Sequence, residues 1–326
     1  MNKQKIRKYL RIFFAMGFFV FLGLLINEMF YQPYRMDKTN DLTKELYHKP
    51  SDAPTNTYPT SFPSEHNGQA DNTARDDQGR LIYFQELLKE NPDTKGWIQI
   101  PDSNIDYVVM QNATDPEYYL HRDFNKEYQK SGCVFIDKKS TIENTPKNVV
   151  IHGHNMRSTN NMFHYLEFMK DLDYFKKHTT INFDTIYQTG RWKIISVFIT
   201  NGSDHQEPFF EYTKSNFRNS SEFLNFVYQL KIRSLYNIDS VDINENDQLV
   251  TLSTCTYELK DYRLVVVARK ERPGETSDIN PEEITENPSP VYPKLFYEKY
   301  HKQVPNLPAT FEEALNQGLI SWYKNK

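Results

Sequence analysis

The stretch LVTLSTCTYELKDYRLVVVARK (residues 249–270) contains two strand-like runs separated by a polar connection. β-Branched and aliphatic residues fill both runs, which is typical of a pleated, half-buried surface. The seven-residue connection, 256–262, favours an antiparallel hairpin. In such a hairpin Cys255 ends the first strand and Arg263 begins the second, so both lie at the same end of the sheet. A fixed cation beside a thiol favours the thiolate, which is the nucleophilic form.

The region from residue 79 to residue 270 has the pattern of a mainly β domain. Short strand-like runs such as GWIQIP (96–101) are separated by turn residues. Apolar residues at helical spacing predict peripheral helices at 162–177 and 220–233. Many short strands with few helices are typical of a closed or nearly closed barrel.

A basic flank and an apolar run occupy residues 1–31. Five Lys and Arg residues lie within the first 11 positions, and residues 12–26 carry no charge. Such a run is typical of a membrane anchor or of the apolar region of a cleaved signal peptide. No small-residue cleavage site follows it, which favours an uncleaved, single-pass anchor. Since basic flanks stay in the cytoplasm, we expect the rest of the chain outside the cell.

Three further segments complete the predicted organisation of the chain. Residues 32–78 are rich in Pro, Asn, Asp, Thr and Ser, and we expect a flexible extracellular stalk there. Residues 271–292 are acidic and Pro-rich, which indicates a linker. Residues 293–326 are expected to form a C-terminal helical extension.

The composition argues against one class of partner and limits the roles of the two cysteines. The net charge of −4 implies no basic face, so nucleic acid is not an expected partner. Two cysteines outside the cell could form one disulfide. However, Cys133 lies in the strand-like run SGCVFID (131–137), where a small buried hydrophobic residue is the simpler interpretation.

A second strand-like run, NVVIHGHNM (148–156), ends in two histidines. His152 and His154 would face the same side of an uninterrupted strand, which suits a catalytic base or a metal site. Gly153 marks a break, so only one of the two needs to face the thiol. A metal would need further ligands, and His164 is the obvious nearby candidate. We therefore expect neither a metal nor another cofactor.

In this order, NVVIHGHNM, VTLSTC and RLVVVARK resemble the three active-site segments of the sortases, the cell-wall transpeptidases of Gram-positive bacteria. The resemblance covers about residues 80–270 and is similar to class B in particular. It implies a closed eight-stranded barrel and maps the family's catalytic residues to His154, Cys255 and Arg263. His152 stands where relatives commonly carry Tyr, which implies a packing or orienting role.

The reaction that this resemblance implies is a two-step acyl transfer. Cys255 would attack the Thr carbonyl of an NPxT- or LPxT-like sorting motif near the C-terminus of a secreted protein. His154 would protonate the leaving amine, and Arg263 would hold the substrate backbone and the oxyanion. The thioacyl intermediate would then react with an amine, expected to come from peptidoglycan. A membrane anchor suits this reaction because both substrates arrive at the outer membrane face.

Two other functions remain open at this point. A class B-type pilin polymerase would use a pilin lysine as the acceptor, and the sequence does not identify the acceptor amine. A non-catalytic surface binding protein could use the same barrel. The intact set of His154, Cys255 and Arg263 argues against that second alternative.

Three residues are candidate substrate contacts. Ser253 lies two residues before the cysteine on the same strand face, although it could equally be a satisfied barrel residue. Asn91, ahead of the first strand, and Tyr257, in the loop after the cysteine, are further groove candidates.

The sequence LPAT (307–310) imitates the start of a sorting signal. Two interpretations are possible. The segment either punctuates a helix, with Thr310 as N-cap, or lies in the groove as a poorly cleaved pseudo-substrate.

Overall fold

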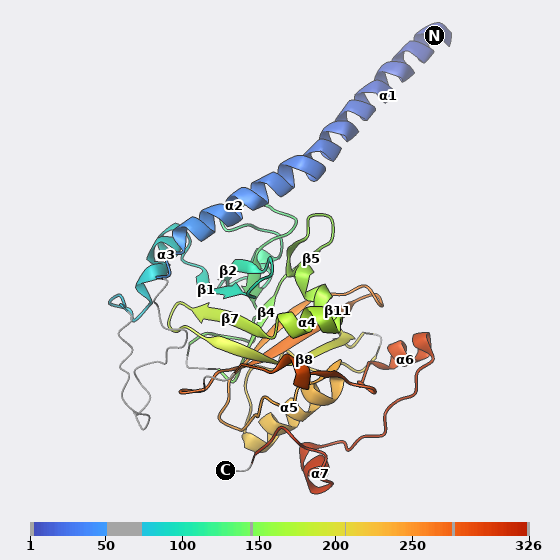
Figure 1. Ribbon diagram of the computed structural model, residues 1–326. Helices are drawn as coiled ribbons and strands as arrows, with labels where there is room; N and C mark the ends of the chain where they lie inside the picture. Colours follow the sequence, from blue (N-terminus) through green and yellow to red (C-terminus); the bar gives the residue numbers. More distant parts are fainter. Residues whose placement is uncertain (1–2, 51–73, 144–145, 206, 276–277, 325–326) are drawn as a thin grey trace.

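A computed structural model describes residues 3–50, 74–143, 146–205, 207–275 and 278–324 (Figure 1). Its centre is a closed barrel of eight strands in the order β1-β2-β3-β4-β10-β11-β8-β7, which confirms the predicted mainly β, eight-stranded barrel. The barrel strands are β1 (Thr94–Gln99), β2 (Asp106–Met110), β3 (Val134–Ile136), β4 (Asn148–His152), β7 (Thr180–Thr185), β8 (Arg191–Asn201), β10 (Leu249–Cys255) and β11 (Tyr262–Lys270).

The hairpin of β10 and β11 lies between β4 and β8 in the closed barrel. Its antiparallel register pairs Leu249 with Arg269 and Cys255 with Arg263. On its other side β10 pairs in parallel with β4. Both hairpin strands are buried along almost their whole length, and the polar residues Thr251, Ser253 and Thr254 of β10 are buried with the apolar ones. The predicted hairpin is confirmed, and β11 begins one residue early, at Tyr262.

Helices and short strands surround the barrel. They are η2 (Ile82–Phe84), α3 (Gln85–Glu90), η3 (Tyr118–Leu120), β5 (Asn155–Met156), β6 (Asn161–Met162), η4 (Phe163–Lys170), α4 (Leu172–Lys177), α5 (Ser220–Arg233), β9 (Tyr236–Asn237), η5 (Pro281–Glu283), β12 (Thr285–Glu286), α6 (Lys294–Tyr300) and α7 (Phe311–Asn316). The helix predicted at 220–233 is α5, which packs on β8. The helix predicted at 162–177 is divided into η4 and α4, because the side chain of Asp171 caps α4 by accepting from the Tyr174 amide.

The N-terminal helix is longer than the sequence indicates. α1 (Lys3–Ile26), the π-helical turn η1 (Asn27–Tyr31) and α2 (Gln32–Leu46) follow one another, and the apolar part is long enough to cross a membrane. The structure therefore differs from the expected stalk over residues 32–46, because α2 has partners on the barrel. Arg35 forms a 2.8 Å ion pair with Asp123. In Figure 1, α1 projects away from the barrel and α2 lies along it. Residues 51–73 of the expected stalk lie outside the described residues.

The segment expected to be a linker, 271–292, packs on the barrel in its described part. Ile279 and Ile284 are buried, and β12 pairs with β9. Its acidic residues do not keep it away from the domain, because several of them face basic residues of the barrel. Arg191 at the start of β8, for example, forms a 2.6 Å ion pair with Glu271.

The LPAT sequence lies on α5. The hydroxyl of Tyr228 donates to the carbonyl of Pro308 at 2.8 Å. The side chain of Thr310 accepts from the Glu313 amide and caps α7. Helix punctuation is therefore confirmed, and the pseudo-substrate interpretation is wrong, because α5 and α7 already hold this segment.

Candidate active site

Three neighbouring strands bring the predicted catalytic residues to one end of the barrel. Cys255 is the last residue of β10 and pairs with Arg263 on β11. On the other side of β10, the parallel pairing with β4 ends with His152 opposite Ser253. His154 follows two residues later, at the same level as Cys255. In strand order, the thiol thus lies between an imidazole and a guanidinium.

The two cysteines differ in their access to solvent. Cys133 is buried, Cys255 is partly exposed, and both thiols are free, so the alternative of a Cys133–Cys255 disulfide is wrong. Burial, assisted by the charge of Asp123, raises the pKa of Cys133 well above its ordinary value. Cys133 therefore stays protonated and inert, as expected for a small buried residue. Only Cys255 is accessible to a substrate.

His154 is held in one orientation by a neighbouring segment. Its Nε2 lies 3.0 Å from the carbonyl oxygen of Leu120, and its ring stacks on His121 with centroids 5.4 Å apart. Because a carbonyl can only accept, Nε2 carries a proton and Nδ1 is the basic atom of the neutral ring. Burial lowers the pKa of His154, and the charges of His121 and Arg263 lower it further, against the opposing effect of the Leu120 carbonyl. A neutral imidazole therefore predominates at pH 7.

Arg263 has unused hydrogen-bonding capacity. Its Nη1 donates to the carbonyl of Tyr262 at 3.1 Å, and no carboxylate in the described part of the chain forms an ion pair with it. Gly202 makes room for the guanidinium. A Cβ added there would lie 2.9 Å from Cζ of Arg263 and 2.7 Å from the carbonyl oxygen of Asp261. The sequence did not identify Gly202, because its turn-like NGSD surroundings (201–204) suggest only a loop.

Asn155 connects the cysteine to two neighbouring side chains. Its Nδ2 donates to the carbonyl of Cys255 at 2.9 Å, and its Oδ1 lies 2.7 Å from Nδ1 of His164. The hydroxyl of Tyr257 donates to the carbonyl of Asn155 at 3.1 Å. Asn155 was not predicted, although its place directly after the candidate histidine was a usable signal. His164, considered above as a metal ligand, has its Nδ1 engaged by this amide.

Ser253 and His152 are paired across β10 and β4, two residues before Cys255, and each has a side-chain hydrogen-bond partner within the protein. The Ser253 hydroxyl is buried, 3.0 Å from the hydroxyl of Tyr212, which favours a satisfied barrel residue over a substrate contact. His152 Nε2 lies 2.9 Å from Oδ2 of Asp137. Burial alone would raise the pKa of Asp137, but hydrogen bonds from His152 and the Lys139 amide outweigh it and hold the pKa below its ordinary value. An ionised Asp137 thus orients His152, and Asp137 was not predicted.

Asn91 is buried, and all its side-chain groups have partners. Its Nδ2 donates to the Tyr119 hydroxyl at 3.0 Å and to the Phe124 carbonyl at 2.6 Å. Its Oδ1 accepts from the Asp93 amide at 3.0 Å. The side chain therefore supports the segment that carries Leu120, the partner of the histidine, and leaves no group free for a substrate.

Comparison with known proteins gives a consistent result. A family model described as the sortase domain matches residues 98–271. Sortase B of Listeria monocytogenes serovar 1/2a is 30% identical over 248 residues, which is 76% of this chain and 89% of the relative. A sortase B structure from Bacillus anthracis aligns with a TM-score of 0.59 and 26% identity over 74% of this chain and 99% of its own. A Staphylococcus aureus sortase B–substrate complex aligns with a TM-score of 0.53 and 30% identity, over 59% of this chain and 86% of its own. The family match ends at residue 271 and does not include the C-terminal part of the chain.

Proposed function

The chain belongs to the sortase family of cysteine transpeptidases and is similar to class B, and on this basis we propose that it attaches secreted proteins to the cell wall. It cleaves a C-terminal sorting motif of the NPxT or LPxT type after the Thr and transfers the protein to an amine of peptidoglycan. The observation that carries the proposal is a partly exposed thiol, Cys255, between His154 on one side and Arg263 on the other.

In the first step the Cys255 thiol gives its proton to neutral His154, and the resulting thiolate attacks the carbonyl carbon of the motif's Thr, so that a C–S bond forms. The tetrahedral intermediate then collapses, which breaks the C–N bond to the following residue. Protonated His154 gives its proton to the nitrogen that leaves. The donors of Arg263 stabilise the oxyanion, since they have no carboxylate partner among the described residues.

His154 serves both steps through the same atom. Its Nε2 proton is held by the Leu120 carbonyl, so the transferred proton is the one on Nδ1. The lowered pKa makes the imidazolium a stronger acid, which favours proton transfer to the leaving amine. The neutral ring then accepts a proton from the incoming amine as that amine attacks the thioester. The new amide forms, the C–S bond breaks, and the Cys255 thiolate is regenerated, so neither a metal nor another cofactor is needed.

The N-terminal helix is proposed to anchor the protein as a single pass, with its N-terminus in the cytoplasm and the barrel outside. The contacts of its outer part support a fixed attachment. Lys44 forms a 3.2 Å ion pair with Asp106, and the hydroxyl of Tyr47, just past α2, donates to Asp184 at 2.8 Å. Such an attachment would keep the barrel near the membrane, where the substrate protein and the peptidoglycan precursor meet at high effective concentration.

The test is turnover of a fluorogenic sorting peptide, measured with and without a small amine acceptor. The full chain should cleave the peptide, and the amine should become coupled to the Thr carboxyl. Cys255→Ala should abolish both reactions. Cys133→Ala is the matched control and should retain activity, because its buried thiol takes no part. Equal cleavage by Cys255→Ala would refute the proposal.

A further inference from the structure

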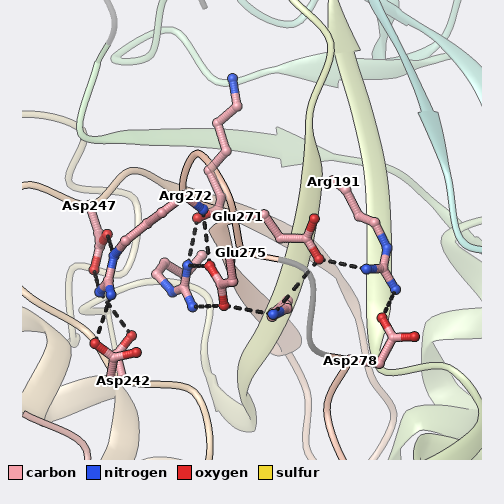
Figure 2. Close-up of polar contacts among 10 residues, drawn as sticks. Arg191, Asp242, Asp247, Glu271, Arg272, Glu275 and Asp278 are labelled. Carbon is pink, nitrogen blue, oxygen red and sulfur yellow. Dashed lines mark hydrogen bonds and ion pairs between the residues drawn. The ribbon is translucent and has the colours of Figure 1, made fainter. Parts of the chain in front are cut away.

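We refer to the described residues beyond the family match, 272–275 and 278–324, as the C-terminal strap, and its helix α6 reaches the active-site end of the barrel. The root of the strap is fixed by ion pairs, which Figure 2 shows. Arg272 forms ion pairs of 2.7 Å with two aspartates, and Glu275 forms one of 2.7 Å with Arg269. Because the side chain of Arg269 is fully buried, the root is more than a loose surface contact.

The beginning of α6 is joined to the first residue of β11. The carboxylate of Glu207 accepts from the Tyr262 hydroxyl at 2.7 Å and from the Leu295 amide at 3.0 Å. Glu207 and Tyr262 are both buried. The strap is therefore connected to the residue directly before Arg263.

The other end of α6 holds the loop that joins β10 to β11, residues 256–261. The ammonium group of Lys299 and, at 3.4 Å, the hydroxyl of Tyr300 donate to the backbone carbonyl of Glu258. On the barrel side, the Glu258 carboxylate forms an ion pair with Lys170. The loop is thus fixed at Glu258 from two directions, and one of them is the strap.

This fixation matters for the side chain that precedes Glu258. Tyr257 is 54% exposed beside the cysteine, and its own hydroxyl bond is to the Asn155 carbonyl. A loop without secondary structure loses conformational entropy when a ligand orders it. Contacts that order the loop before the substrate arrives lower this cost of binding.

We infer that α6 is a positioning element for the substrate groove. Lys299 and Tyr300 hold loop 256–261, and Tyr257 with it, in the conformation that receives the sorting peptide. They act through the loop and do not touch the reacting atoms. The inference rests on the proposed function and adds a specific role for a segment that the family match does not include.

The test compares the full chain with the double variant Lys299→Met/Tyr300→Phe. The matched control is Lys294→Met, which removes the same charge from the same helix but from an ammonium group paired with Glu298. We expect the KM for a sorting peptide to rise roughly threefold to tenfold in the double variant, as for the loss of one or two hydrogen bonds. The kcat, and the rate at which iodoacetamide alkylates Cys255, should stay within about twofold, because α6 takes no part in the β10–β11 pairing. In Lys299→Arg the KM should stay close to the wild-type value, because the guanidinium can still donate to the Glu258 carbonyl.

Hydrogen exchange of loop 256–261 gives a second readout that does not depend on turnover. The amides of this loop should exchange faster in the double variant than in the wild type or the control. An unchanged KM with unchanged exchange would overturn the inference, and so would a loss of kcat at constant KM. If the wild type does not turn over the peptide, the proposed function fails, and the exchange data then decide this inference alone.

Discussion

Strand β11 carries two arginines with opposite surroundings. Arg269, near its C-terminal end, is fully buried and makes two hydrogen bonds of 2.7 and 2.8 Å to the carboxylate of Glu275. Arg263, at the other end, is partly exposed and donates only to a backbone carbonyl among the described residues. A buried guanidinium needs carboxylate partners to offset its lost hydration, so Arg269 has no donor pair left for a ligand. Arg263 keeps its planar fork of donors available. The two arginines therefore differ in role because of their partners: Arg269 stabilises the fold, whereas Arg263 is available to a ligand.

The largest effect is expected from Arg263→Lys, because a compact ammonium cannot reproduce the fork of donors. The kcat/KM for a sorting peptide should fall roughly a hundredfold to a thousandfold, as when an oxyanion donor is removed. Thermal unfolding should stay close to that of the wild type, since no carboxylate loses its partner. Near-wild-type turnover would mean that Arg263 is only a charge at the end of a strand.

Arg269→Met is expected to lower stability and to leave the kcat unchanged. This change leaves the Glu275 carboxylate with Lys193 as its remaining ion-pair partner. The free energy of unfolding in denaturant should fall by about 3 kcal/mol, as for a broken buried pair. At temperatures where the variant is folded, its kcat should match the wild type. A large loss of kcat with unchanged stability would reverse the roles assigned to the two arginines.

Asn155→Ala tests whether support for the thiol lies outside the three predicted catalytic residues. The change removes the donor to the Cys255 carbonyl and the acceptor for His164. We expect kcat/KM to fall about tenfold, the effect of losing the hydrogen bond to the Cys255 carbonyl. Steady-state kinetics on the peptide measures it, and activity within error of the wild type would show that the cysteine needs no such support.

The smallest effect is expected from His121→Gln, which removes one of the charges that lower the pKa of His154. The pKa of His154 should therefore rise, and an NMR titration of its ring measures the change. The lowered pKa of His154 also makes the stability of the fold depend on pH. Because the folded pKa of the wild type lies below the unfolded value of about 6.5, stability is lost as the pH falls from there through the folded pKa. The variant should lose less stability in that range, and a lower pKa in the variant would contradict this account.

The features that could be predicted from the sequence are those formed by residues close together in the chain. The β10–β11 hairpin brings Cys255 and Arg263 together over a short loop, so a local pattern was sufficient. The carbonyl of Leu120 and the space above Gly202 could not be predicted, because tertiary contacts bring them to His154 and Arg263.

The polar segments on either side of the domain show the same limit. Composition indicated a stalk and a linker, but α2 and the strap contain single residues with specific partners. Arg35 and Arg272 are examples, each with an acidic partner at least 25 residues away in the sequence. Composition averages over such residues and cannot reveal where their partners lie.

The most direct test of the central claim is mass spectrometry of the full chain after incubation with a library of sorting peptides. The account predicts a thioacyl adduct on Cys255, heavier than the free protein by the N-terminal peptide fragment less one water. The adduct should end in Thr, disappear on addition of hydroxylamine, and be absent from Cys255→Ala. Peptide cleavage that continues in Cys255→Ala, or an acyl group found on another residue, would contradict the account.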